Sequence, residues 1–467
     1  MKTCVQAVVS RTGTGVQTIT GIVDQNGATF QGTFAFAIAV GAVLDTLSYQ
    51  GGPNVTATVL NQGADDGTNG ACGAFGDIDQ FFAKIVSTGD ARRYSVGDYQ
   101  PDIFFGGNWQ GYGYVSAFRD GEVDITFDLN NRGGWGFLLV VLGGDDLIVD
   151  TSASMSSGIY ATSGAPVAVL AMSSAYAMGS TPTATTGAGG QQMLWGWDTR
   201  SSGKAVAAAW MGNMGGNIRG QVTDRLWGIL FGASFSGAAY VSSWDDLSYT
   251  IADGFVSACN RFAFSGVRAF ADAVPLRTTP GLQVINVGMA ARWVKVVTVG
   301  TIPGAAVDAT QMQLCIGWSD GTRQGCAWIG ETKSGHPITG TRLLSSNALV
   351  RVSAGAAANL TAFTAVASLV DIDGSVGTIT LDVTDTDGTP YEILLFVLGD
   401  PLESQPAVTG TTQPAWTLNR FDQKIRIEGP NGSPPPRAFG RPIDWVEDGV
   451  RWKLERCDLT AREEDTA

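Results

Sequence analysis

The chain has one histidine and few charged residues. Only 15% of its 467 residues are Asp, Glu, Lys or Arg, and the one histidine, His336, stands in the turn-like sequence Ser-Gly-His-Pro. Histidine is the side chain that most often performs acid–base catalysis near neutral pH. The count excludes a histidine-rich metal site, and a Ser-His-Asp or Cys-His site would have only His336 to use. We therefore expect a loop histidine and no enzymatic activity.

Basic residues are scarce as well. The chain has 29 Lys and Arg against 43 Asp and Glu, which gives a formal net charge of −14. Nucleic-acid binding depends on basic patches, and attraction to an anionic membrane surface needs the same sign of charge. The sequence therefore predicts no nucleic-acid partner and no membrane partner. A hydrophobic content of 44% argues against a disordered chain.

Long apolar runs and paired cysteines are missing. Apolar stretches such as residues 135–142 and 393–398 are the size of a strand and fall short of the roughly 20 residues of a membrane helix. Residues 1–10 lack the basic and apolar regions of a signal peptide. The six cysteines are scattered without CxxC pairs, which indicates small buried residues in a protein made inside a cell.

A sequence signature of cofactor binding is also absent. Despite its 62 glycines, the chain has no Walker-type phosphate loop. We expect the glycines to serve turns, and we expect no cofactor. Many glycines and 17 prolines with few Lys and Glu favour short strands joined by turns over helices. The predicted fold class is all-β.

Three blocks of sequence recur later in the chain at offsets of 253 to 256 residues. The first block begins with Asp-Gly-Thr and ends with Cys, the second has an Asp-Gly turn before an alternating strand, and the third is a continuous apolar run. The paired blocks are residues 66–72 with 320–326, 118–129 with 371–383, and 137–143 with 393–399. Because three blocks keep nearly one offset, the sequence indicates a duplicated unit.

Half of this offset predicts a middle copy of about 127 residues. Residues 114–120 (Tyr-Val-Ser-Ala-Phe-Arg-Asp) are echoed by residues 240–246 (Tyr-Val-Ser-Ser-Trp-Asp-Asp). The first and third copies open with Gly-x-Gln-x-Ile, at residues 15–19 and 281–285, and we assign a degenerate middle opening to residues 164–167. The sequence therefore predicts three tandem copies.

Each copy has the pattern of a β-sandwich. Val123, Ile125 and Phe127 alternate with polar neighbours, and Asp-Gly pairs at 120–121, 373–374 and 387–388 predict hairpin turns. We expect three antiparallel, jelly-roll-like sandwiches followed by a Pro-rich linker and a charged C-terminal arm. The predicted boundaries are 1–150, 151–278 for the degenerate copy, 279–404, and 405–467 for the linker and arm.

Acidic residues cluster beside several predicted turns. The adjacent pairs Asp65-Asp66, Asp145-Asp146 and Asp245-Asp246 suit backbone contacts within turns better than a glycosidase dyad, because neighbouring strand residues face opposite ways. Two Asp-x-Asp-Gly loops, at residues 371–374 and 385–388, offer oxygen ligands for calcium, but they do not fit the EF-hand pattern. We expect acidic turns and no metal site.

Aromatic residues gather in one part of the first copy, among Gly, Asn and Gln. Such a group can stack on sugars, form a protein interface or close a small local core, and these three interpretations stay open. The candidate glycan or interface residues are Tyr99, Phe104, Phe105, Trp109, Tyr112 and Tyr114. In the charged arm, Trp445 and Trp452 are candidate anchoring residues.

The repeated unit resembles β-sandwich repeats of structural proteins from tailed-phage virions, over roughly residues 12–400. The resemblance depends on the Gly-x-Gln-x-Ile opening, a Gly/Trp strand before the Asp-Gly turn, and a closing Ile-Thr-x-Asp strand. It implies a tail, baseplate, head-fibre or decoration protein that assembles as a symmetric homo-oligomer, with a trimer as the first guess. The chain departs from the family pattern in its weak middle copy and in the missing Pro-Lys-Ala strand after the opening.

These observations predict a non-enzymatic virion component, made in the host cytoplasm, whose partners are its own copies and other virion proteins. A glycan-binding adhesin or receptor-binding fibre, which would contact a host surface glycan, is the alternative that the aromatic group favours. A polysaccharide depolymerase is the third hypothesis, based on the paired carboxylates.

Overall fold

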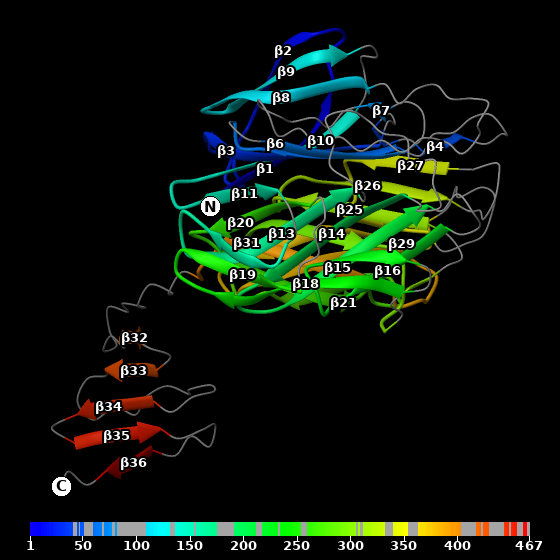
Figure 1. Cartoon of the computed structure of the whole chain (residues 1–467). Helices are drawn as coiled ribbons and strands as arrows, with labels where there is room; N and C mark the ends of the chain where they lie inside the picture. The colour runs from blue at the N-terminus through cyan, green and yellow to red at the C-terminus, as the bar shows by residue number, and fades with distance from the viewer. Residues whose placement is uncertain are drawn as a thin grey trace. The chain divides into compact units, whose positions relative to one another are not determined.

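The computed structural model divides into two compact units, Met1–Leu402 and Glu403–Ala467 (Figure 1). Its described elements, β1 to β36, are all strands, so the predicted all-β class is confirmed. No described segment is a helix that is long and apolar enough to span a membrane. The structure describes residues 1–40, 44–45, 47–50, 59–67, 70–76, 80–81, 109–130, 136–153, 156–174, 191–211, 217–231, 234–253, 259–304, 307–308, 312–331, 340–353, 363–402, 417–421, 424–428, 443–447, 450–454 and 461–464.

The first lobe, residues 2–143, consists of an inner and an outer sheet. Its strands are β1 (Lys2–Val9), β2 (Gly15–Thr20), β3 (Gly32–Ala39), β4 (Leu47–Gln50), β5 (Val59–Asp65), β6 (Gly70–Gly76), β7 (Gln80–Phe81), β8 (Trp109–Arg119), β9 (Glu122–Asn130) and β10 (Gly136–Gly143). The inner sheet has the order β1-β10-β3-β5-β6 and the outer sheet has the order β2-β9-β8-β7. Buried side chains from both sheets pack together between them, which makes the lobe a sandwich.

The second lobe, residues 148–265, has the same two layers. Its strands are β11 (Ile148–Ala153), β12 (Gly158–Ala161), β13 (Pro166–Ser174), β14 (Gln191–Thr199), β15 (Lys204–Met211), β16 (Asn217–Val222), β17 (Trp227–Phe231), β18 (Ser234–Trp244), β19 (Ser248–Ala252) and β20 (Asn260–Ser265). The inner order is β11-β20-β13-β14-β15-β16 and the outer order is β12-β19-β18-β17.

The third lobe, residues 268–400, repeats the arrangement. Its strands are β21 (Arg268–Pro275), β22 (Gly281–Asn286), β23 (Ala290–Thr298), β24 (Val307–Asp308), β25 (Met312–Ser319), β26 (Gln324–Glu331), β27 (Gly340–Ser345), β28 (Val350–Val352), β29 (Ala365–Asp373), β30 (Thr378–Thr386) and β31 (Glu392–Asp400). The inner order is β21-β31-β23-β25-β26-β27 and the outer order is β22-β30-β29-β28.

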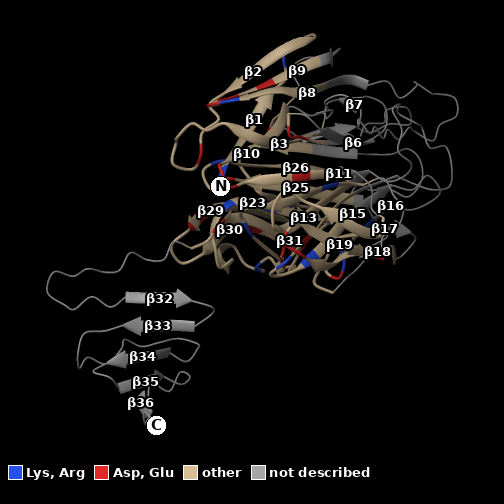
Figure 2. Cartoon of the chain, turned by 60° about the vertical axis from the view of Figure 1, so that its left-hand side comes forward, with Lys and Arg blue, Asp and Glu red and all other residues tan. Residues whose placement is uncertain are grey.

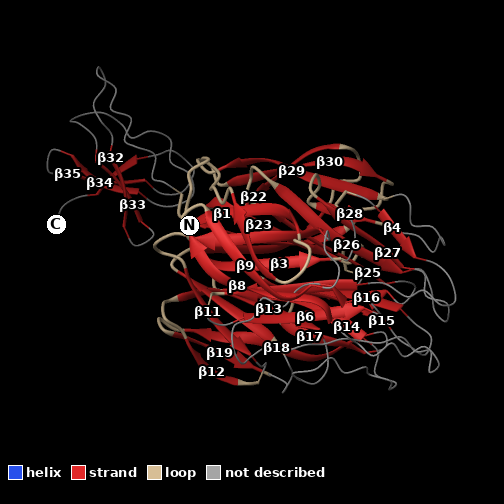
Figure 3. Cartoon of the chain, turned by 90° about the horizontal axis from the view of Figure 1, so that it is seen from above, coloured by secondary structure: helices blue, strands red, loops and turns tan. Residues whose placement is uncertain are grey.

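The strand order is therefore the same in three successive segments. In each inner sheet the last strand of the lobe lies between the first and the third, and in each outer sheet the second strand is at the edge. This topology agrees with the predicted repeat, which remains an inference from the sequence. Figure 3 shows the strands of the three lobes from above.

The lobe boundaries differ from those expected from the sequence. The predicted boundary at 150/151 falls inside β11, and the one at 278/279 separates β21 from β22, although β21 pairs with β31 of the same lobe. The middle opening also lies earlier than predicted, because β12 (Gly158–Ala161), and not residues 164–167, pairs with the outer strand β19. Residues 164–167 lead instead into the inner strand β13. The degenerate sequence of the middle copy explains the misplacement.

One core joins the three lobes, where the sequence predicted three separate sandwiches. The inner strands are apolar on both faces: in β10, Phe137, Leu139 and Val141 pack inside the sandwich, while residues 138, 140 and 142 face the other lobes. An inner sheet alone would expose one of these faces to water, so each buries it against the others. This central core includes Phe36 and Trp293, whose rings stack at 5.4 Å.

Aromatic rings from all three lobes meet in this central core. Phe36 of lobe 1 also contacts Phe262 of lobe 2 edge to face at 5.4 Å, and Trp293 of lobe 3 contacts Phe396 at 5.9 Å. Such pairs add about 0.5–1.5 kcal/mol beyond the area that they bury. The lobes are therefore parts of a single compact unit.

Short strands pass from one lobe to the next. β4, from lobe 1, pairs with β27 and so extends the inner sheet of lobe 3, while β24, from lobe 3, pairs with β16 of lobe 2. β4 comes from the connection between β3 and β5, and β24 comes from the equivalent connection between β23 and β25. Pairing covers edges that would otherwise present free backbone N–H and C=O groups.

The Gly-x-Gln opening predicted from the sequence has the same structure in lobes 1 and 3. The Gln17 side chain accepts the Arg11 N–H at 2.7 Å and donates to the Val9 carbonyl at 2.9 Å. Gln283 makes the equivalent bonds, to Arg277 N–H at 3.0 Å and to the Pro275 carbonyl at 2.9 Å. The glutamine amide thus satisfies both backbone groups where the chain leaves the first strand.

Other local predictions are confirmed in part. Val123, Ile125 and Phe127 are buried, and the Asp-Gly turn at residues 120–121 joins β8 to β9 with Gly121 at a φ of 72°. The pair at residues 387–388 does not form a hairpin, because β30 and β31 lie in different sheets. Its Asp and Gly instead turn the chain from the outer to the inner layer.

The second unit, Glu403–Ala467, is a separate β structure. Its strands are β32 (Thr417–Phe421), β33 (Lys424–Glu428), β34 (Ile443–Glu447), β35 (Val450–Leu454) and β36 (Ala461–Glu464), and they form one sheet in sequence order. The predicted start of the linker, residue 405, lies two residues after the start of this unit. The arm expected from the change in composition therefore has strand structure of its own.

Candidate functional site

The aromatic group predicted in the first lobe is only partly described. Tyr99, Phe104 and Phe105 lie outside the described residues. Trp109 and Tyr112 are on β8, where only their backbone is described, and Tyr114, on the same strand, is half-buried and pairs with Thr126 of β9. The structure thus places three of the six on one outer strand, and their role stays a prediction.

The two predicted anchoring residues of the arm are neighbours. Trp445 of β34 pairs directly with Trp452 of β35 in the antiparallel register. His336 lies outside the described residues. The predicted anchoring role of the two tryptophans is not tested by this pairing.

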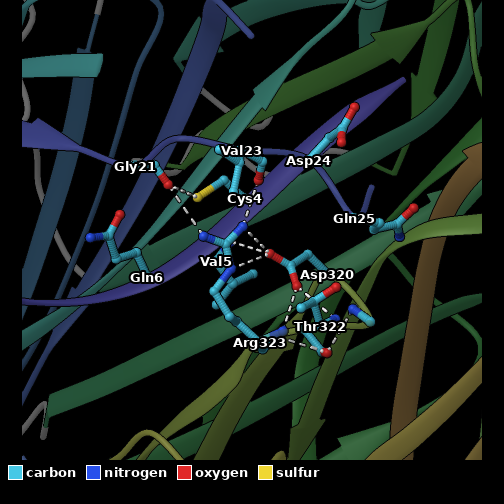
Figure 4. Close-up of polar contacts among 12 residues, drawn as sticks. Cys4, Val5, Gln6, Gly21, Val23, Asp24, Gln25, Asp320, Thr322 and Arg323 are labelled. Carbon is cyan, nitrogen blue, oxygen red and sulfur yellow. Dashed lines mark hydrogen bonds and ion pairs between the residues drawn. The ribbon is translucent and has the colours of Figure 1, made fainter. Parts of the chain in front are cut away.

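The contact between lobe 3 and lobe 1 centres on a buried carboxylate (Figure 4). Asp320, at the turn between β25 and β26, is 0% exposed. One of its oxygens accepts the N–H of Val5 in lobe 1 at 2.8 Å, and the other accepts the N–H of Thr322 at 2.9 Å. Because β1 is the edge strand of its inner sheet, this N–H has no strand partner, and the turn of lobe 3 satisfies it.

Arg323 completes this contact. Its guanidinium pairs with Asp320 at 2.9 Å and donates to the Val23 carbonyl of lobe 1 at 2.6 Å. In Figure 4 the arginine lies between the acid and the loop that follows β2. A second arginine of lobe 3, Arg292, bonds Gln25 of the same loop at 2.8 Å. The residues 21–31 of lobe 1 are thus held by two arginines of lobe 3.

The contact between lobe 2 and lobe 3 uses the equivalent turn with different side chains. The turn from β14 to β15 is closed by a hydrogen bond from the Thr199 N–H to the Gly203 carbonyl at 3.1 Å. The turn from β25 to β26 in lobe 3 is closed in the same way, by a bond from the Asp320 N–H to the Arg323 carbonyl. The Ser202 hydroxyl accepts the N–H of Ala271 on β21 at 2.8 Å. Ala271 of β21 pairs with Phe396 of β31, and Val5 of β1 pairs with Val140 at the matching position of β10. The N–H groups of Ala271 and Val5 are therefore equivalent. A neutral hydroxyl here does what a carboxylate does at the other contact.

This second contact leaves a pocket of about 400 Å³. Gly203 stands where lobe 3 has Arg323, so no side chain from this position enters the space. The connection between β22 and β23 is residues 287–289, much shorter than residues 21–31 of lobe 1, which fill the other contact. The lining includes Trp197, Gly203, Lys204, Thr223, Phe270 and Asp272.

A second set of carboxylates ties inner to outer sheets. Asp65, at the end of β5, accepts the N–H of Val115 on β8 at 3.2 Å, and Asp198, at the end of β14, accepts the N–H of Val241 on β18 at 2.8 Å. Burial raises the pKa of Asp65 to about 7 and that of Asp198 to about 6, against the opposing effect of these backbone bonds.

Lobe 3 replaces this carboxylate. Ser319 has the equivalent register position, opposite Val294 of β23. The outer N–H, that of Leu369, is accepted instead by the side-chain oxygen of Gln324 at 2.8 Å. Lobe 3 therefore makes the same connection without a titratable group.

A lysine is buried in the central core. Lys295 of β23 is 0% exposed, and its Nζ, 3.0 Å from the ring centroid of Trp195, has no hydrogen-bond partner among the described residues. Burial lowers the pKa of this amine well below the usual lysine value. Its register partner is Phe396, so it stands where lobe 1 has Phe36 and lobe 2 has Leu170.

The acidic loops have turn contacts of their own. Asp373 accepts the Ser375 N–H at 2.9 Å, and Asp387 accepts the Thr389 N–H at 2.9 Å and the Tyr391 hydroxyl at 2.8 Å. Within the described part of the chain, no group of three or more His, Cys, Asp or Glu is placed to hold a metal ion.

Charged residues of both signs are sparse over the described lobes (Figure 2).

Sequence reasoning missed the residues that surround the pocket. Lys204, Phe270 and Asp272 belong to no motif, and each comes from a strand whose pattern indicates only β structure. The one available signal was the difference between Gly203 and Arg323. The closing hydrogen bond spans one residue more in lobe 2, from Thr199 to Gly203, than in lobe 3, from Asp320 to Arg323, and this hides the equivalence.

Comparisons of the chain with models of protein families, with curated proteins and with solved structures give no match.

Proposed function

We propose that the chain is a structural, non-enzymatic component of a bacteriophage particle. The observation that supports this most is the closed three-lobed body, in which three sandwiches share one core. Contacts between lobes use turns and added strands that satisfy edge backbone groups, as with Asp320 and Val5. Closed β bodies with covered inner edges suit a building block that must stay folded while it packs against neighbours.

Exposed aliphatic side chains support assembly through the outer surface. Val16, Ile159 and Leu282 have the same place on the outer edge strands β2, β12 and β22, and they are 51%, 75% and 61% exposed. Exposed apolar groups at matching places favour protein contacts. A homo-oligomer, with a trimer as the first arrangement to test, is part of this proposal, and virion proteins are the other partners.

The C-terminal unit supports a second attachment. It is compact, has its own sheet and includes the Pro-rich residues 405–436. We propose that it contacts a neighbouring subunit or another virion protein.

Mass spectrometry and electron microscopy of purified particles test this function. We expect the chain in the particle at a fixed copy number and at a symmetric position. Its absence from particles would contradict the proposal.

Light scattering on the isolated protein tests the assembly surface. Val16→Lys and Leu282→Lys should weaken the oligomer, and Thr20→Lys, which puts the same charge on an exposed residue of β2, should not. A monomer at all concentrations, or equal effects of all three variants, would overturn the assignment of this surface.

A further inference from the structure

The proposed structural role does not explain the pocket between lobes 2 and 3. Its volume of about 400 Å³ is within the range of small-molecule sites, about 300–1,000 Å³. The equivalent space between lobes 3 and 1 contains the Arg323 side chain, bonded to Asp320 and Val23. The fold does not require an open space at this position, since the other contact fills it.

Charged groups of both signs and polar groups line the pocket. Lys204 comes from lobe 2, with its Nζ 4.5 Å from the ring centroid of Tyr240, and it is half-buried. Asp272 comes from β21 of lobe 3, and its carboxylate is exposed, as is Thr223 of lobe 2. One cation and one anion in the lining give a site that is neutral overall.

An aromatic ring supplies the apolar part of the lining. Phe270 of β21 is half-buried and packs with its inner side against the sandwich core of lobe 3. Its position is fixed by this packing, so the ring does not have to be ordered when a ligand binds. A fixed ring beside hydrogen-bonding groups of both kinds suits a ligand with an apolar face and several hydroxyls.

We propose that this pocket binds one residue of an uncharged glycan. The Asp272 carboxylate accepts hydroxyl protons, the Lys204 ammonium and the Thr223 hydroxyl donate to ring or hydroxyl oxygens, and the Phe270 ring packs against the C–H face of the sugar. A neutral ligand fits because the opposite charges of Lys204 and Asp272 leave no excess charge to compensate. This binding activity goes beyond the structural role and does not depend on it.

A glycan array with the full-length chain is the first test, followed by titration of the best neutral glycan. Asp272→Ala should weaken binding at least tenfold, because a hydrogen bond to a charged group is lost. Gly203→Arg should abolish binding by placing the side chain found at the equivalent contact in the pocket. The thermal midpoint of each variant checks that the fold is kept.

Two control variants match these changes outside the pocket. Asp246→Ala removes an exposed carboxylate of lobe 2, and Thr278→Arg adds an arginine to an exposed loop of lobe 3. Both should bind as the parent chain does. The proposal is overturned if no neutral glycan binds, if binding survives both pocket variants, or if only acidic glycans bind and Asp272→Ala leaves their affinity unchanged.

Discussion

The turn contact between lobes 3 and 1 and the turn contact between lobes 2 and 3 share a backbone arrangement and differ in their side chains. Between lobes 3 and 1, Asp320 accepts the edge N–H and Arg323 fills the space beside it. Between lobes 2 and 3, Ser202 accepts the equivalent N–H, and Gly203 leaves a pocket. The common strand order fixes which backbone groups need a hydrogen-bond partner, while the residue at each position decides whether the contact is closed or open.

The largest difference between the contacts should appear on removal of the acceptor. Asp320→Ala leaves the Arg323 guanidinium and the Val5 N–H without their partner at a buried site, which should lower the free energy of unfolding by about 3–5 kcal/mol. Ser202→Ala removes one neutral acceptor and should lower it by about 1 kcal/mol. Denaturant unfolding of both variants measures the difference, and equal losses would show that the two contacts are energetically alike.

The buried lysine should be the next largest effect. Replacing Lys295 with Leu, the residue at the equivalent position of lobe 2, should raise stability by about 1–4 kcal/mol, because an unpaired amine leaves the core. The folded pKa of Lys295 is below its unfolded value, so stability of the parent chain should rise with pH toward the ordinary lysine pKa.

Unfolding of Lys295→Leu and the parent at pH 7 and pH 9.5 checks this prediction. The gap between the two proteins should narrow at the higher pH. Lys204→Leu, at a half-buried lysine, is the control and should show neither the gain nor the pH dependence. A destabilised Lys295→Leu would mean that the amine has a favourable role in the core.

The sheet-tying carboxylates should make lobes 1 and 2 respond to pH where lobe 3 does not. Asp65 and Asp198 have folded pKa values, about 7 and about 6, above the usual aspartate value of 3.8. Raised pKa values favour the protonated folded state. The contribution of the two carboxyl groups to the free energy of unfolding is therefore complete below pH 4 and is lost as pH rises through 6 and 7.

Asp65→Asn and Asp198→Asn should therefore flatten the fall in stability between pH 4 and pH 7.5, by about 1–2 kcal/mol each. Thermal midpoints across this range measure the effect, with Asp246→Asn as an exposed control. An unchanged pH profile in both buried variants would contradict the assignment.

The smallest effect concerns the glutamine that lobes 1 and 3 share. Gln17→Ala and Gln283→Ala each remove an equivalent pair of bonds to the backbone and should each cost about 1 kcal/mol. Unequal losses, measured by denaturant unfolding, would show that the matching geometry hides different energies.

Local structure could be read from the sequence where one sandwich determines it. The alternation of Val123, Ile125 and Phe127 depends only on one buried face, and it is confirmed. The glutamine openings were found as a motif because both copies make the same short-range bonds. The all-β class followed in the same way from turn residues and strand patterns.

The arrangement of the lobes could not be read from the sequence. The apolar run at residues 137–142 shows that both faces are buried, but it does not show that the second face packs against other lobes. The pocket depends on Gly203, which has no side chain, and on the short loop at residues 287–289. Neither feature forms a sequence motif. Such a site is found only by comparing equivalent positions of the lobes, and the structure is needed to show which positions are equivalent.

Hydrogen exchange of the Phe36→Ala variant tests most directly whether the lobes share one core. Phe36 belongs to lobe 1 and contacts Phe262 and Trp293 of the other two lobes. We predict faster exchange in β20 and β23, in lobes 2 and 3, as well as in β3. Faster exchange confined to lobe 1, with unchanged protection in the other lobes, would contradict a common core.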